Sequence, residues 1–172
     1  MTKKLIIYST TDGHTKRICD YIVDRLKEKS PIRIISIDDV KNIDLSLYET
    51  IIIGASIRYG KHQPELYEFI QSNLEVLKTI KASFFSVNAV ARKPNKDSPE
   101  TNPYVKKFLK LSNWQPEVVG VFAGKINYPK YRFFDKHIIR LIMWLTKGPT
   151  DTSGIYEFTD WGKVDEFIHK IT

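Results

Sequence analysis

The sequence contains very little cysteine and no long hydrophobic run. Its 172 residues include one cysteine, Cys19, which excludes a disulfide framework and a cysteine-based zinc site and favours a reducing cytoplasm. The most apolar stretch, residues 138–145, is interrupted by Arg140 and is far shorter than the roughly 20 residues of a membrane-spanning helix. The four histidines lack the spacing of metal ligands, so no metal site is expected.

Acidic residues are outnumbered by basic ones. The chain has 27 Lys and Arg against 20 Asp and Glu, a formal net charge of +7. This surplus favours an anionic partner, which could be a nucleic acid, an acidic lipid or a small acidic substrate. With 42% hydrophobic residues the chain can bury a core, and its length favours one domain over residues 1–172.

Strand and helix signals alternate along the chain. Short apolar runs predict five strands, over residues 5–9, 32–37, 50–54, 82–90 and 118–123. Helical spacing predicts helices over residues 15–28, 64–74, 103–111 and 160–169. Thr159 is the expected cap of the last helix. Strands that are apolar on both faces and separated by helices indicate an α/β fold with a doubly wound parallel sheet.

Residues 125–150 do not fit this alternation and are predicted to be an insertion with a helix over residues 137–146. About thirty residues separate Gly124 from Gly154, where a simple connection should be much shorter. Residues 125–147 contain six basic residues and one acidic residue. One face of the expected helix carries Phe134, Ile138, Leu141, Ile142 and Leu145, while Ile139, Met143 and Trp144 lie off that stripe. This excess of apolar residues among basic ones also suits a membrane surface.

Three loops should meet at one edge of the sheet, where ligands bind in doubly wound folds. The first loop, residues 9–15, opens a helix whose N-terminus favours an anion such as phosphate. Its members are Ser9, Thr10, Thr11, Asp12, Gly13, His14 and Thr15. The loop has neither a nucleoside-triphosphate nor a dinucleotide glycine pattern. An ordinary helix cap explains the same residues about equally well, and Asp12 is expected to accept backbone N–H bonds that shape the loop.

The second loop, residues 54–62, and the third loop, residues 86–96, follow the next two buried strands. Small residues including Ser56 leave space at the second loop, and Tyr59 could cover a flat ligand or be a plain surface aromatic. The third loop could bind the polar edge of a planar ring through Asn88 and its backbone, or be a solvated basic loop. Its candidate residues are Ser86, Val87, Asn88, Ala89, Val90, Ala91 and Arg92.

These loops resemble those of flavodoxins, which bind FMN. Five motifs extend the resemblance over essentially the whole chain: Tyr-Ser-Thr-Thr-Asp-Gly-His-Thr at 8–15, Gly-Ala-Ser-Ile-Arg-Tyr-Gly-Lys-His at 54–62, Phe-Phe-Ser-Val-Asn-Ala-Val-Ala-Arg at 84–92, Ala-Gly-Lys-Ile-Asn-Tyr-Pro-Lys-Tyr at 123–131 and Thr-Asp-Trp at 159–161. With these motifs the chain resembles the quinone-dependent protoporphyrinogen IX oxidases of bacteria more closely than it resembles flavodoxins. The Tyr-Pro-Lys-Tyr-Arg segment of the insertion is the most specific part of this resemblance.

The resemblance implies a flavodoxin-like sheet in the order 2-1-3-4-5 and an FMN-dependent oxidoreductase. The first loop would hold the FMN phosphate, and the flavin ring would lie between the second and third loops. Thr150, Asp151 and Thr152 would also contact FMN. The implied reaction, a step of haem biosynthesis, is the oxidation of protoporphyrinogen IX to protoporphyrin IX. Electrons would pass through FMN to menaquinone or ubiquinone, and no side chain is identified as a catalytic acid or base.

The insertion is expected to bind the substrate, which is flat and carries two propionates. The candidate residues are Lys125, Tyr128, Lys130, Tyr131, Arg132, Lys136 and Arg140. The expected location is the cytoplasm, with peripheral association at the inner face of the cell membrane through anionic lipid. An electron carrier of the flavodoxin type and an NAD(P)H-dependent quinone reductase remain alternatives. A nucleic-acid partner is disfavoured, because such modules need a continuous basic stripe or a stacking platform.

Overall fold

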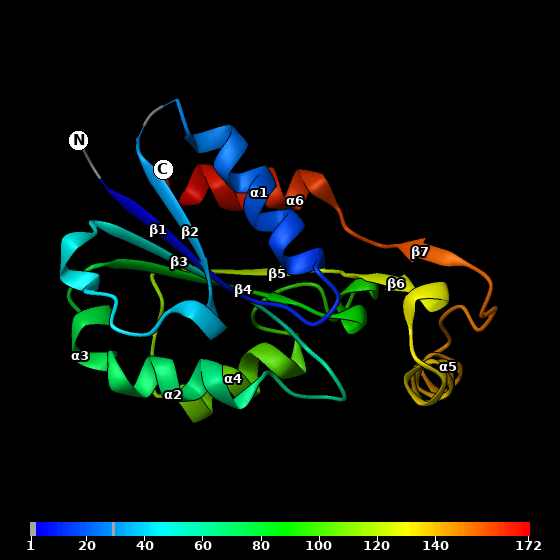
Figure 1. The fold of residues 1–172 in the computed structure, drawn as a ribbon. Helices are drawn as coiled ribbons and strands as arrows, with labels where there is room; N and C mark the ends of the chain where they lie inside the picture. Colours follow the sequence, from blue (N-terminus) through cyan, green and yellow to red (C-terminus); the bar gives the residue numbers. More distant parts are fainter. Residues whose placement is uncertain (1–2, 29) are drawn as a thin grey trace.

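A parallel sheet of five strands forms the centre of the computed structural model, which describes residues 3–28 and 30–172. The strands are β1 (Lys4–Ser9), β2 (Ile32–Ser36), β3 (Thr50–Ser56), β4 (Lys81–Val87) and β5 (Val118–Phe122). Their order, β2-β1-β3-β4-β5, is the predicted one (Figure 1). Ser9 pairs with Ala55, which pairs with Ser86, so the register brings the starts of all three loops side by side.

Helices cover both faces of the sheet, as its doubly apolar strands require. The helices α1 (His14–Leu26) and α6 (Trp161–Lys170) lie on one face. The other face carries α2 (Pro64–Ser72), α3 (Leu74–Leu77) and α4 (Pro103–Ser112) (Figure 1). Alternate residues of β1 enter different cores: Ile6 packs with α1 and α6, whereas Leu5 and Ile7 pack with α2 and α4.

Within the described residues, four short 3-10 helices lie in the connections, and one of them corrects a predicted strand. They are η1 (Ile37–Asp39), η2 (Leu45–Leu47), η3 (Ala89–Arg92) and η4 (Tyr128–Lys130). The strand predicted over residues 82–90 ends at Val87, because the Asn88 side chain accepts a hydrogen bond from Ala91 N and caps η3. Likewise, Asp160 rather than Thr159 caps α6 by accepting from the N–H groups of Gly162 and Lys163.

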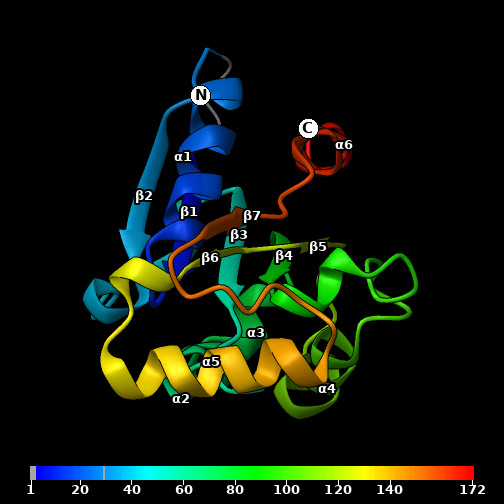
Figure 2. The same cartoon turned by 90° about the vertical axis from the view of Figure 1, so that its right-hand side faces the viewer.

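The insertion leaves the sheet beyond the carboxyl ends of the strands. It begins with β6 (Lys125–Asn127), which pairs antiparallel with β7 (Ile155–Glu157), a strand that follows the insertion; the sequence predicted neither strand. Between them α5 (Phe133–Leu145) begins four residues before the predicted helix. Figure 2, which views the molecule from this end, shows α5, β6 and β7 in front of the strands.

The two faces of α5 have different surroundings. Ile139 and Met143 are buried against Ile126 and the fully buried ring of Tyr128. The stripe of apolar residues noted in the sequence points outward, apart from the half-buried Ile142. Its exposed members, with their neighbours, are Phe133, Phe134, Ile138, Leu141, Trp144 and Leu145. The insertion therefore carries a contiguous apolar surface, although no helix of the described residues has the length and apolar character needed to cross a bilayer.

We expect Gly54→Ala to destabilise the protein by about 1–3 kcal/mol, as overpacking of a core typically does. A methyl group at position 54 would lie 2.2 Å from Cζ of Phe85, whose ring is fully buried, so the ring or the strand has to move. The free energy of unfolding from a urea titration measures this effect. An unchanged midpoint would mean that β3 and β4 pack less tightly than the structure shows.

Candidate functional site

A cleft that is open in part to solvent lies at the carboxyl edge of the sheet. All three predicted loops line it, through residues 10–12, 14–15, 56–60 and 87–90. The insertion forms the opposite wall with Ile139, Ile142 and Met143 of α5 and with Thr146, which follows the helix. The sequence did not identify these four residues as site residues, although the four-residue spacing of Ile139 and Met143 is a signal of one helix face.

The first loop has the properties of an anion site. Gly13 precedes α1 in the left-handed conformation, with φ 83°, and no side chain caps the helix. Thr15, in the first turn, is fully buried, and its hydroxyl has no hydrogen-bond partner among the described residues. A buried hydroxyl without a partner is costly, whereas an anion bound at this helix end would accept its hydrogen bond. These observations favour an anion site over the ordinary cap.

His14 fastens this loop to the end of the sheet. Its Nε2 lies 2.6 Å from the Thr159 hydroxyl, which itself donates to the carbonyl of Ala123 at 2.8 Å. Because that hydroxyl has one hydrogen, the Nε2 atom of His14 is the donor. Burial lowers the pKa of His14, which favours the neutral ring. Thr159 thus connects the first loop to Ala123, the residue that follows β5, and does not cap α6.

Asp12 pairs with the second loop instead of shaping its own loop. Its carboxylate lies 2.8 Å from Nη1 of Arg58, which corrects the expectation that backbone N–H groups bind it. Burial raises the pKa of Asp12, and the positive charge of Arg58 opposes that rise. Arg58 thereby connects two of the three loops.

The second loop turns tightly at the mouth of the cleft. Backbone hydrogen bonds join Arg58 and Lys61 in both directions, and the two residues between them, Tyr59 and Gly60, have φ values of 50° and 78°. Positive φ at both central positions is typical of a type I′ turn. Tyr59 is 44% exposed, and its hydroxyl contacts Asp135 at the start of α5. Its ring therefore lies where the second loop meets the insertion.

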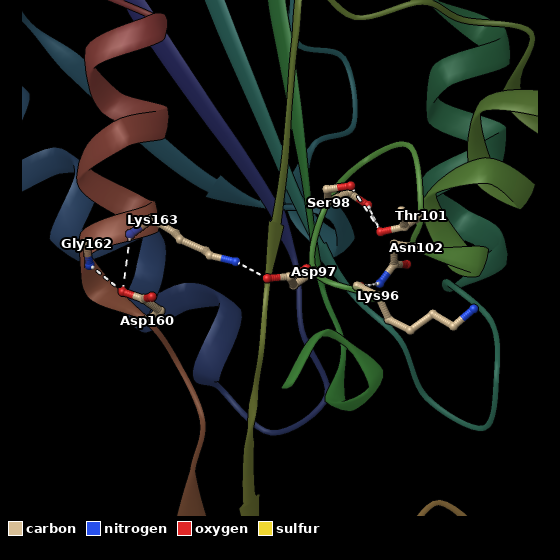
Figure 3. A network of polar contacts seen from close by, with 8 residues as sticks. All are labelled: Lys96, Asp97, Ser98, Thr101, Asn102, Asp160, Gly162 and Lys163. Carbon is tan, nitrogen blue, oxygen red and sulfur yellow. Dashed lines mark hydrogen bonds and ion pairs between the residues drawn. The ribbon is translucent and has the colours of Figure 1, made fainter. Parts of the chain in front are cut away.

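The third loop contributes its backbone rather than the Asn88 side chain. The Oδ1 atom of Asn88 accepts from Ala91 N at 3.1 Å and from Asn102 Nδ2 at 3.0 Å, while its Nδ2 donates to the Ser86 hydroxyl at 3.1 Å. Figure 3 shows how the far end of the loop is held: Asn102 donates to the carbonyl of Lys96 at 2.7 Å. The amide of Asn88 is therefore committed to the loop's own structure.

An ion pair at Asp97, the residue after the third loop, connects this segment to α6 on the opposite face of the sheet. Lys163, at the start of α6, contacts the carboxylate of Asp97 (Figure 3). The lysine's hydrogen bond lowers the pKa of Asp97. The loop backbone that lines the cleft is thus held at both ends before any ligand binds.

Several other candidates lie outside the cleft. Ser9 donates to Gln63, and Ser86 is bonded to His62 and Asn88. Ala91 and Arg92 line a separate pocket, and Arg92 donates to the carbonyls of Ala89 and Thr146, which anchors the end of α5. The structure does not bring the segment 150–152 to the cleft: Thr150 lies in a groove beside α5, and Asp151 binds Ser153.

The substrate candidates of the insertion divide into three groups. Lys125 and Tyr131 line the cleft and, with Lys130, an adjoining pocket beside Arg17. Tyr128 is buried and donates its hydroxyl to the carbonyl of Pro149 at 2.7 Å, so it supports the insertion from within. Away from the cleft lie Arg132, Lys136 and Arg140.

Comparison with known proteins assigns the fold and the family. A flavodoxin-domain family model matches residues 5–153. A protoporphyrinogen IX dehydrogenase (quinone) of Leishmania major is 42% identical over 167 residues, which are 96% of this chain and 72% of the relative. The enzyme of that name from Escherichia coli K12 is 39% identical over 98% of this chain and 94% of its own length.

Solved structures agree with this fold. The oxidised flavodoxin 1 of Bacillus cereus superposes with a TM-score of 0.56 over 99% of this chain and 97% of its own, at 17% identity. The two-electron reduced flavodoxin of Megasphaera elsdenii gives 0.54 over 69% of this chain and 84% of its own, at 12% identity. At these identities the likeness concerns the fold alone.

Thr15→Val should leave the ligand-free protein as stable as the parent or slightly more stable, because it removes a buried hydroxyl without a partner. The same change should weaken FMN binding about 10- to 100-fold, the value of one hydrogen bond to a charged group. Thermal unfolding and flavin fluorescence titration measure the two effects. Thr15→Ser, which keeps the hydroxyl, is the control. Equal FMN affinity in the parent and Thr15→Val would exclude the hydroxyl from the phosphate site.

Proposed function

This chain belongs to the flavodoxin-domain family that includes these two dehydrogenases, and on that premise we propose that it is an FMN-dependent oxidoreductase that converts protoporphyrinogen IX to protoporphyrin IX and passes the electrons to a quinone. One observation carries this proposal. The 39% identity to the Escherichia coli enzyme extends over 98% of the chain, so the alignment includes the insertion as well as the flavodoxin core. The relatives' names do not favour the electron carrier or the NAD(P)H-dependent quinone reductase.

The residues of the cleft fit FMN. Gly13 and Thr15, at the open N-terminus of α1, would hold the phosphate. Tyr59 and the backbone of residues 87–90 would hold the ring. Bound there, FMN supplies reversible two-electron transfer between the two substrates. The protein supplies position and partial shielding, because the apolar side chains of α5 on the opposite wall would cover part of a bound ring.

Lys125 and Lys130 are the cations best placed for the substrate's propionates. Lys125 lines both the cleft and the adjoining pocket, and Lys130 lines that pocket together with Arg17. Arg17 is already paired with Glu157 at 3.0 Å, so the two lysines carry the available positive charge. Residues 11–14 of the first loop line this pocket as well, so the carboxylates of a porphyrinogen in the cleft would lie beside the phosphate end of FMN.

The outward face of α5 is a candidate membrane contact. Phe134 and Trp144 are 78% and 68% exposed, and basic residues of the insertion flank the apolar surface. Apolar side chains beside lysines and arginines are typical of helices that lie on anionic bilayers, and quinones such as menaquinone and ubiquinone dissolve in the membrane. We therefore infer that the protein acts in the cytoplasm at the inner face of the cell membrane, with α5 against the lipid.

Purified protein loaded with FMN should convert protoporphyrinogen IX to fluorescent porphyrin only when a quinone is supplied. Lys125→Ala combined with Lys130→Ala should raise the KM for porphyrinogen about tenfold or more, because two charge-assisted contacts are lost. Reduction of the flavin by dithionite should be unaffected in this variant. Quinone reduction by NAD(P)H without porphyrinogen oxidation would contradict the proposed reaction.

Vesicles that contain anionic lipid should bind the protein, and Phe134→Ser with Trp144→Ser should weaken that binding about tenfold or more through lost apolar burial. High salt should weaken vesicle binding by the parent and by this double variant, because each flanking cation contributes about 1 kcal/mol to binding near an anionic surface. Co-sedimentation measures the bound fraction. The matched control is Leu47→Ser with Leu111→Ser, which removes two apolar residues that are 60% and 54% exposed elsewhere. Equal losses in both variants would exclude α5 as the contact.

A further inference from the structure

Arg58 occupies an unusual position between the first loop, the second loop and the insertion. Its side chain is 19% exposed, and its guanidinium lies 2.8 Å from Asp12 and 3.6 Å from Asp135. The Cζ atom lies 5.2 Å from the ring centres of both Tyr59 and Tyr131. The planar cation is thus stacked and ion-paired at once, a combination that an arginine supports and a lysine does not.

Asp12 presents an electrostatic problem for the proposed FMN site. It sits next to Gly13, in the same loop whose open helix end and buried Thr15 hydroxyl favour an anion. A carboxylate at this position repels a phosphate group, because like charges a few ångströms apart repel each other even where solvent partly shields them. The other carboxylate near Asp12, Asp135, adds to the same negative potential and does not relieve it.

We propose that Arg58 acts through Asp12 as a positioning residue that makes the first loop selective for the phosphate form of the flavin. Paired with Arg58, the Asp12 carboxylate is neutralised and turned toward the second loop, so it repels the phosphate less. The tyrosine rings and Asp135 hold the guanidinium in place from the other side. This inference rests on the proposed function insofar as FMN is the cofactor.

Comparison of FMN with riboflavin, which lacks the phosphate, tests the idea on the ligand-free protein. Arg58→Gln should lower FMN affinity about tenfold and leave riboflavin affinity within about twofold. The change leaves the Asp12 carboxylate without its cation, and only the phosphate of FMN is repelled by that charge. Asp12→Asn should bind FMN at least as tightly as the parent. The double variant Asp12→Asn with Arg58→Gln should recover most of the affinity that Arg58→Gln loses.

These variants separate electrostatics from loop structure. If the ion pair merely holds the loops together, either single change should weaken FMN and riboflavin alike, and the double variant should be no better than Arg58→Gln. That pattern would overturn the inference. Arg25→Gln is the control for net charge, because Arg25 pairs with Asp165 rather than with Asp12 and lines none of the pockets described above. It should leave the ratio of FMN to riboflavin affinity unchanged.

Failure of the proposed function gives a different result. A parent protein that binds neither flavin would overturn FMN as the cofactor, and the role of Arg58 with it. A parent that binds FMN more tightly than riboflavin, with the same preference in Arg58→Gln, would overturn the role of Arg58 alone. Fluorescence quenching of each flavin by titrated protein gives both affinities without any turnover.

Discussion

The parallel sheet constrains everything else in this structure, because all five strands deliver their carboxyl ends to one edge. Ser9 pairs with Ala55, and Ala55 pairs with Ser86, so the three loops leave their strands at the same level of the sheet. The insertion leaves β5 at the same edge, so α5 can only lie beside or above these loops. Arg92 and Asp135 fix its two ends to the third and second loops. A cleft shared by the flavodoxin core and the insertion follows from this connectivity.

Local polar groups then decide which surfaces of the loops are available to a ligand. The side chains of Asn88 and Ser86 are consumed in bonds within the protein, which hold the third loop's backbone in position. Thr15 is the opposite case, since its hydroxyl is buried without a partner. Such a group destabilises the ligand-free protein, and a ligand that accepts its hydrogen bond removes that destabilisation. This contrast matches the proposed FMN site, in which the rigid part would face the ring and the unsatisfied part would face the phosphate.

The fold and the position of the site were largely predictable from the sequence, since apolar strands and helix spacing are local signals. Five strands in the correct order and three loops at one edge followed from them and from the family resemblance. The caps were harder: Thr159 and Asp160 are adjacent and equally suitable, and the contact of Thr159 with His14, 145 residues away, decides between them. The same holds for Asp12 and Arg58, whose pairing joins residues that sequence spacing does not connect.

The direction of α5 could not be predicted because the helix is apolar on more than one side. Its inner residues, Ile139 and Met143, complete a small core with Ile126 and Tyr128 and close the cleft. That core uses only part of the helix, and the larger apolar residues, such as Phe134 and Trp144, remain exposed. A surface of this kind is rarely kept on a soluble domain without a function. One helix could therefore serve both substrates: its inner face lines the site where porphyrinogen would react, and its outer face would meet the phase in which a quinone dissolves.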